Sequence, residues 1–404
     1  MTTTRFYNAI KLEGQYIDLP YGSYTLAQIS VLPGSIMSMN MPRHALVTLY
    51  SQNNFTGVSL VVPNYGNKSL KVTGWAPQYP YTVQSLTIEC ACKLNNYSNV
   101  IYQVTTTSVA IGNQAAVGYT FYNVNPEPIK SQLGPPSPYN PTILIIPDFG
   151  MNMASYAWIQ GEFALHRFSS IVLDLGGIGI SSPVTDSTYA TIIQNYRYIA
   201  QLLNQYTKKP IVIGHGVGGA IAQLWALTYK FELRKLILID TAPYAVYTTY
   251  NLLNTTIQSW INNTLSTANF ATAVVNATYN TRSEDCQNAK LKLDYTNSIT
   301  SADPTSLKLL FTQNPDVPSL AMAPKFILVH TLIIHGLYDD SVELDGGHTL
   351  HNLIEHSRYI KIGAGHSPQF TTADRIIEAI IQFLLDGKKL YMDPVPVQQN
   401  TIIL

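Results

Sequence analysis

Three short segments carry groups that could work together in catalysis. Asp339 follows an apolar run and lies three residues after Gly336, and His366 lies in a later glycine-rich loop, residues 363–368. A carboxylate that orients an imidazole can make that imidazole a general base. The third segment, residues 213–219, follows another apolar run and opens a helical stretch. Its central residue is Gly216, which has no nucleophilic atom.

The turn around Gly216 is where a nucleophile would be expected. A Gly-x-Ser-x-Gly turn presents its serine at the top of a sheet, and small neighbours allow the tight bend. Gly214 and Gly218 preserve those neighbours, but the hydroxyl is missing. Neither an aspartate nor a cysteine stands nearby to take its place, so we expect no carboxylate or thiol nucleophile. The N–H groups of Phe149 and Val217 are the candidates for an oxyanion hole.

Taken in order, these segments resemble the α/β-hydrolase superfamily over about residues 103–388. Residues 146–150 stand where that family has a His-Gly-aromatic loop. Residues 174–181 match its Asp-x-Arg-Gly-x-Gly-x-Ser loop, with Gly176 in place of the arginine. The order nucleophile, acid, base is also that of the family. The resemblance implies an α/β-hydrolase fold, with a helical cap at about residues 241–325.

The missing serine points away from ordinary hydrolysis. In a well-studied triad enzyme, loss of the nucleophile lowers turnover by roughly a millionfold. Families such as the N-myc downstream-regulated proteins have lost this serine and act without hydrolysis. We therefore expect a catalytically inactive protein with a structural, assembly or binding role, in which Asp339 and His366 are a vestigial dyad. Two alternatives stay open: the dyad activates water in an esterase-like hydrolase or lyase, or the pocket under the cap binds a small apolar molecule.

The elements that would position these groups follow from the apolar pattern. From residue 142 onward, short and fully apolar runs alternate with stretches of helical spacing. Such runs are typical of parallel strands that helices cover on both faces. Before them, residues 103–124 suggest a leading hairpin of the same domain, although the other interpretation is a linker up to residue 141 and a domain that starts at Thr142. Residues 389–404 are expected to be a C-terminal tail.

Residues 1–92 have a different hydropathy pattern, in which apolar and polar residues alternate between turns. This pattern predicts antiparallel strands. The pattern Tyr-x4-Phe-x-Gly at Tyr50, Phe55 and Gly57 has a counterpart 43 residues earlier, with Leu12 in place of the aromatic. This repeat resembles the βγ-crystallin Greek-key motif and implies an all-β sandwich, followed by a linker at residues 93–102. Ser85 matches the serine of that motif, and in the first copy Ile29 stands near the serine position. The oxygen ligands that calcium needs are missing before both positions, so we expect no tight calcium site.

Composition excludes some classes of function. Lys+Arg and Asp+Glu are both 24, so there is no basic excess for nucleic acid. No run is long and apolar enough for a membrane span, and no leader peptide is visible, which favours the cytoplasm or an assembled particle or matrix. Low charge and 27 tyrosines favour self-association or a protein partner.

We expect no cofactor and no metal. The residues with possible metal spacing, on a predicted helix after Asp339, are interpreted as a solvated face: His348, His351, Glu355 and His356. Ser181, Ser182 and Ser367 are expected to bond loops, and His335 to be buried structure.

Overall fold

The computed structural model describes most of the chain, in two compact units that are treated separately below. Unit 1 comprises residues 1–106, 120–140 and 160–170, and unit 2 comprises residues 107–119, 141–159 and 171–404. The described residues are 3–42, 45–64, 69–74, 81–90, 102–110, 116–124, 142–166, 168–184, 189–203, 209–243, 254–279, 289–312, 323–371, 373–385 and 401–403. The predicted linker lies outside them except for Tyr102, as does the predicted tail except for residues 401–403.

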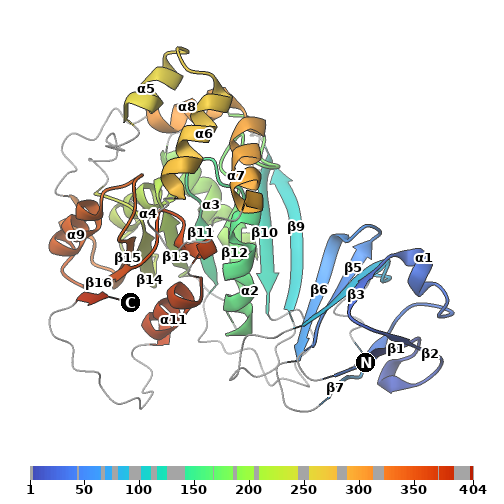
Figure 1. The fold of residues 1–404 in the computed structure, drawn as a ribbon. Helices are drawn as coiled ribbons and strands as arrows, with labels where there is room; N and C mark the ends of the chain where they lie inside the picture. Colours follow the sequence, from blue (N-terminus) through green and yellow to red (C-terminus); the bar gives the residue numbers. More distant parts are fainter. Residues whose placement is uncertain are drawn as a thin grey trace. The chain divides into compact units, whose positions relative to one another are not determined.

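Unit 1 is built from antiparallel strands, as the alternating pattern predicts. One sheet has the order β2-β1-β4-β7, and a second run of strands has the order β6-β5-β8-β3 (Figure 1). The strands are β1 (Thr4–Tyr7), β2 (Tyr16–Leu19), β3 (Gly22–Tyr24), β4 (Ser38–Met41), β5 (Ala45–Gln52), β6 (Thr56–Asn64), β7 (Leu70–Val72) and β8 (Ser85–Cys90). Side chains from both sets form a single core, which includes Phe6, Met39, Leu49 and Leu86.

Two turns of unit 1 repeat the same hydrogen bonds. The hydroxyl of Ser85 accepts from the N–H of Phe55 (3.0 Å) and donates to the carbonyl of Gln52 (2.8 Å). In the first copy, Ser38 accepts from the N–H of Leu12 (3.1 Å) and donates to the carbonyl of Ala9 (2.6 Å). The serine of the first copy is therefore Ser38. The prediction that placed Ile29 near this position was wrong, because Ile29 belongs to helix α1 (Leu26–Ile29) and its side chain lies in the core.

Unit 2 contains the parallel sheet that the apolar runs predict. Its order is β17-β16-β15-β14-β13-β11-β12-β10-β9, and the pairs from β11 to β17 for which registers are known are parallel. The strands are β9 (Tyr102–Ala110), β10 (Ala116–Asn123), β11 (Ile143–Ile146), β12 (Ser170–Leu173), β13 (Ile211–His215), β14 (Lys235–Ile239), β15 (Thr331–Gly336), β16 (Ser357–Ile362) and β17 (Thr401–Ile403). β9, β10 and β12 have residues in both units.

The strand order creates a switch point between β11 and β13. The chain runs from β11 to β12 on one side and then returns to β13 on the other side. Loops diverge at such a point, and ligand sites lie beyond the carboxyl ends of the strands there. The loop after β11 and the turn after β13 are therefore neighbours, although about 70 residues separate them in the sequence.

Helices accompany the sheet, and four of the described ones lie in the stretch where the cap was predicted. Between β14 and β15 the helices are α5 (Asn254–Ile261), α6 (Thr267–Thr278), α7 (Ala289–Ser301) and α8 (Pro304–Thr312), drawn in yellow and orange in Figure 1. The others in unit 2 are α3 (Tyr189–Leu203), α4 (Val217–Thr228), α9 (Leu344–Leu353), α10 (Pro368–Thr371) and α11 (Ala373–Leu385), while α2 (Ala157–Leu165) lies in both units.

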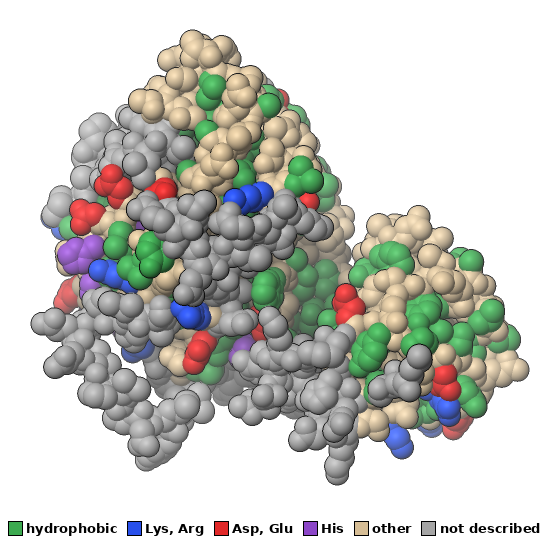
Figure 2. Space-filling model, in the orientation of Figure 1, with side chains coloured by type: hydrophobic (Ala, Val, Ile, Leu, Met, Phe, Trp, Pro, Cys, Tyr) green, Lys and Arg blue, Asp and Glu red, His purple; other side chains and the backbone are tan. Residues whose placement is uncertain are grey.

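The surface reflects the low share of charged residues. On the face in Figure 2, the Lys, Arg, Asp and Glu side chains of the described residues are scattered rather than gathered in a large patch of one sign. None of the described helices combines the length and the apolar character that crossing a bilayer requires.

Candidate active site

Gly216 forms the tight turn between β13 and α4. Its backbone has φ +48° and ψ −114°, and α4 begins at the next residue, Val217. A side chain at either flanking glycine would meet the backbone: a Cβ on Gly214 would lie 2.4 Å from the carbonyl oxygen of Gly218, and a Cβ on Gly218 would lie 2.1 Å from that of Ile146. These close approaches explain why the turn keeps glycine on both sides.

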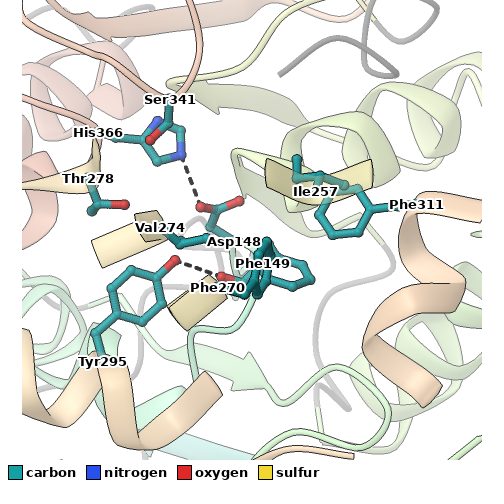
Figure 3. Close-up of a pocket in the computed structure, with 10 residues that line it drawn as sticks. All are labelled: Asp148, Phe149, Ile257, Phe270, Val274, Thr278, Tyr295, Phe311, Ser341 and His366. Carbon is teal, nitrogen blue, oxygen red and sulfur yellow. Dashed lines mark hydrogen bonds and ion pairs between the residues drawn. The ribbon is translucent and has the colours of Figure 1, made fainter. Parts of the chain in front are cut away.

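A carboxylate from another loop occupies the space into which a side chain at position 216 would extend. Asp148, two residues after the end of β11, accepts a hydrogen bond at Oδ1 from the N–H of Val217 (2.8 Å). Its Oδ2 lies 3.0 Å from Nε2 of His366 (Figure 3). A Cβ on Gly216 would lie only 1.9 Å from Oδ1 of Asp148. The prediction that no aspartate takes the position was therefore wrong, because the side chain that fills it belongs to the adjacent strand's loop.

The predicted dyad is assembled beside this carboxylate. Nδ1 of His366 lies 2.7 Å from Oδ2 of Asp339, and all three side chains of the Asp148–His366–Asp339 chain are buried. The other oxygen of Asp339 accepts from the N–H groups of Ser341 (2.7 Å) and Val342 (2.9 Å). Each ring nitrogen of His366 thus faces a carboxylate oxygen, and this arrangement favours an imidazolium that donates in both directions.

The electrostatics agree with this assignment. Burial alone would lower the pKa of His366, but the charges of Asp339 and Asp148 raise it well above its ordinary value. Burial would likewise raise the pKa of Asp148, but the charge of His366 and its hydrogen bond lower it to about 2. At neutral pH, His366 is therefore the charged partner of two carboxylates and is not free to accept a proton.

A small cavity lies against the Asp148–His366 pair. It measures about 260 Å³, a volume that includes space open to solvent, and is lined by Asp148, Phe149, Ile257, Phe270, Val274, Thr278, Tyr295, Phe311, Ser341 and His366 (Figure 3). Helices α5 to α8 provide most of its walls, and apart from Thr278 these residues are apolar or aromatic. Typical sites for small ligands measure 300–1,000 Å³, so even this upper bound suits only a small guest.

Comparison with known proteins agrees with this fold. Residues 141–373, more than half of the chain, match the family described as the alpha/beta hydrolase fold. The chain belongs to the α/β-hydrolase family. No curated protein matches the sequence.

Solved structures of several α/β-hydrolases resemble the chain. A hydrolase from Pseudomonas aeruginosa PA01 and an esterase from Exiguobacterium antarcticum each match with a TM-score of 0.57 at 16% identity, over 69% of this chain and 98% of theirs. The enol-lactonase from Burkholderia xenovorans LB400 matches with a TM-score of 0.56 at 16% identity, over 69% of this chain and 100% of its own. At such identities the likeness is one of fold.

Two residues that the sequence analysis missed, Tyr156 and His215, hydrogen-bond to the backbone of the site residues. The N–H of Asp148 donates to the hydroxyl of Tyr156 (2.9 Å), which lies 2.9 Å from Nδ1 of His215. Nε2 of His215 lies 2.8 Å from the carbonyl oxygen of His366. Burial lowers the pKa of His215 to about 4, so this ring is neutral, donates from Nε2 and accepts at Nδ1. The chain of bonds ties the Asp148 loop to the His366 loop.

A second buried carboxyl lies beyond Asp339. Asp240, directly after β14, accepts from the N–H of Gly336 (2.7 Å). Burial and then the charge of Asp339 raise its pKa well above the ordinary value, which favours the neutral acid. His335 is buried, as predicted, and its Nε2 lies 3.0 Å from the carbonyl oxygen of Val342.

Two buried clusters bring together the residue types that bind metal ions: Asp148, His215 and His366 in one, and Asp240, His335 and Asp339 in the other. In the first cluster, both nitrogens of His215 and both of His366 already make hydrogen bonds within the protein. In the second, Nε2 of His335 and Oδ2 of Asp339 are similarly engaged. A metal ion would have to displace these bonds, so the donor sets do not fit one well.

The remaining predicted residues lie in varied surroundings. Phe149 forms part of the cavity wall, and its carbonyl accepts from Tyr295 (2.8 Å); a role for its N–H stays a prediction. Ser181 bonds loops as expected, because its hydroxyl donates to the carbonyl of Asp174 and accepts from the N–H of Gly118, each at 2.9 Å. Ser367 is buried. Among the described residues, His348, His351, Glu355 and His356 form no cluster with metal-binding geometry.

Proposed function

We propose that this α/β-hydrolase-family protein does not catalyse acyl transfer, and that its hydrolase-like unit serves binding or assembly. One observation carries the proposal: the carboxylate of Asp148 occupies the place of the serine hydroxyl. It also takes up the N–H of Val217, which in an acyl-transfer enzyme would stabilise a developing oxyanion.

The protonation states support the same conclusion. An acyl-transfer base must accept a proton, whereas the raised pKa of His366 keeps this ring charged at neutral pH. A water-based esterase, our alternative from the sequence, would need His366 neutral and the oxyanion position open. The cavity of about 260 Å³ favours a small apolar guest over the substrate of a large esterase.

The test is a panel of p-nitrophenyl esters with four proteins: native, Gly216→Ser, Asp148→Gly with Gly216→Ser, and that double variant with His366→Ala. We expect native protein and Gly216→Ser to be silent, since the serine Cβ would meet Asp148. The double variant clears the space and restores a hydroxyl beside His366, so it should gain turnover that the His366→Ala change removes. Native turnover that depends on His366 would refute the proposal.

We propose in addition that residues 1–92 form a βγ-crystallin-type Greek-key domain used for packing or interaction. The hydrolase-like domain would then comprise residues 103–388. The exchange of β3 and β7 between the two sets of strands supports this topology, as do the matched turns at Ser38 and Ser85. Several apolar side chains of unit 1 are exposed, among them Val31 at 69% and Tyr16 at 54%. Sedimentation velocity of the full chain over a wide concentration range tests this role. Concentration-dependent association is expected, and a strict monomer that captures no partner would contradict it.

A further inference from the structure

Two exposed histidines stand side by side at the amino ends of neighbouring strands. His330 directly precedes β15 and His356 directly precedes β16, and the N–H of Thr331 donates to the carbonyl of His356 (2.9 Å). Their ring centroids are 5.6 Å apart, and the ring planes are tilted by 46°. We propose that the imidazoles of His330 and His356 together bind one divalent ion of a late transition metal, namely copper, nickel or zinc. The site is separate from the Asp148–His366 pair, whose residues follow the carboxyl ends of β11 and β16.

Both rings are free to act as metal ligands. Both histidines are exposed, and within the described part of the chain neither ring has a hydrogen-bond partner. In contrast, His215, His335 and His366 are buried, and each uses at least one ring nitrogen for a hydrogen bond within the protein. An ion at His330 and His356 therefore has no hydrogen bond between described residues to displace, unlike an ion in either of the buried clusters.

The distance between the two rings suits a shared ion. With metal–nitrogen bonds of about 2.0–2.1 Å and a tetrahedral angle, two imidazoles on one ion have ring centres roughly 5 Å apart. The observed 5.6 Å is close to this value, and exposed side chains change rotamer within nanoseconds, so the rings can turn their nitrogens to a common ion. The backbone needs no movement, because Thr331 and Ser357, which follow the two histidines, are paired in the ladder between β15 and β16. His356 thus has its partner on the neighbouring strand rather than on α9.

The ligand chemistry selects the class of metal. Imidazole nitrogen suits copper, nickel and zinc, whereas calcium and magnesium prefer oxygen ligands. Among the described residues, no third His, Cys, Asp or Glu completes a cluster with the pair, so the remaining positions on the ion are left to water or to donors of another molecule. Copper and nickel accept nitrogen and oxygen ligands in a tetragonal arrangement, and divalent copper generally binds more tightly than nickel or zinc. Cupric ion is therefore the most sensitive probe.

One positive charge nearby opposes a bound cation. Lys235 lies on β14, the other neighbour of β15, at the same level as His330. Its ammonium group is held at the end of α11, where it donates to the carbonyl of Phe383 and lies 4.4 Å from the centroid of the Phe383 ring. This charge weakens the site, and it makes the contribution of each imidazole to the affinity more decisive.

The test is calorimetric titration of the full, metal-free chain with cupric ion. Native protein should bind one ion per chain at this site. His330→Gln and His356→Gln should each weaken that binding by about tenfold or more, because each removes one of two protein ligands. Both positions are exposed, so the variants should fold as the native protein does. His348→Gln is the matched control: its side chain is 52% exposed and lies near Asp345, and the affinity should stay within about twofold of native.

Electron paramagnetic resonance of the cupric complex shows whether the imidazoles are ligands. Native protein should give nitrogen hyperfine structure from two imidazoles, and either single variant should give that of one. Three results would overturn the inference: a native chain that binds no ion, an affinity that is unchanged when both histidines are replaced, or a spectrum without imidazole nitrogen. None of these results bears on the ester panel, so the inference and the proposed function succeed or fail separately.

Discussion

The two matched turns of unit 1 and the two neighbouring loops at the switch point of unit 2 differ in where the side chain that braces them comes from. In unit 1, Ser38 and Ser85 make the same two hydrogen bonds in two copies of one turn. In unit 2, the turn after β13 has glycine at its centre, and Asp148 from the loop after β11 fills the space that a side chain there would take. The two turns of unit 1 thus use the same residue type at the same place, whereas at the switch point the side chain comes from the loop of the neighbouring strand.

The difference follows from the distances over which the groups act. Ser38 on β4 and Ser85 on β8 each brace the backbone of a turn that follows the paired strand, β1 or β5, and the same residue type makes the same two bonds in both places. At the switch point, β11 and β13 are hydrogen-bonded neighbours, and both loops reach the same point above the sheet. The N–H of Val217 and the ring of His366 need a polar atom between them, and either loop can supply it.

The largest expected effects come from changing either Gly216 or Asp148 alone. Gly216→Ser should lower the free energy of unfolding by about 3 kcal/mol or more, because overpacking of this kind costs about 1–3 kcal/mol and the backbone there has positive φ. Asp148→Gly alone should cost about 3–5 kcal/mol, since it leaves His366 without one of its carboxylates.

Combining the two substitutions tests whether the side chains at positions 148 and 216 compete for one space. The double variant should be more stable than the sum of the single effects by roughly 2–3 kcal/mol, which urea unfolding of the four proteins measures. Additive effects would mean that the two positions do not share one space.

The next effect is the pH dependence of stability. The pKa of Asp148 is lowered to about 2, so its contribution is present above about pH 4 and is lost as the pH falls toward 2. The pKa of His366 is raised, so its contribution is present below about pH 6.5 and is lost as the pH rises through the raised value. Native protein should therefore exceed Asp148→Asn in stability most between about pH 4 and 6.5, by roughly 2–3 kcal/mol. Thermal unfolding of both proteins at several pH values measures this, and a constant difference would contradict the ion pair.

A smaller effect is expected at the paired serines. Ser38→Ala and Ser85→Ala each remove two hydrogen bonds to the backbone and should each cost about 1–2 kcal/mol. Because the geometry is the same, the two costs should agree within about 0.5 kcal/mol, whereas the exposed control Ser23→Ala should change stability by less than that amount. Urea unfolding of the three variants checks this, and strongly unequal costs would show that the two turns are alike in shape but not in energy.

The sequence was informative where structure depends on neighbours along the chain. Fully apolar runs predicted the parallel strands, and the spacing of glycines predicted the turn at Gly216. Motif order suggested that Asp339 and His366 act together, and the structure places their side chains 2.7 Å apart, while their role stays a prediction. Asp148 was missed because only residues close to Gly216 in the sequence were considered as replacements. The available signal was a carboxylate two residues after the end of the neighbouring strand, opposite a glycine with free space beside it.

Ser38 was missed for a different reason. The serine follows its hydrogen-bonded turn residue by 26 positions in the first copy and by 30 in the second. A fixed offset therefore fails, although the turn residues themselves keep an offset of 43. Segments between strands can change length without disturbing a sheet, and for that reason spacing across them is a poor guide.

The smallest effect is expected from a substitution that makes the two matched turns of unit 1 more alike. Phe55 meets Tyr50 edge to face, with ring centroids 5.9 Å apart, whereas the first copy has Leu12 at the equivalent place. Both residues are half-buried and have φ near +60°, so Leu12→Phe places an aromatic in a backbone that already accepts one. An aromatic pair with Tyr7 should stabilise the protein by about 0.5 kcal/mol. Thermal unfolding resolves such a change beside Leu12→Ala, and destabilisation by the phenylalanine would mean that the first copy has adapted its packing to leucine.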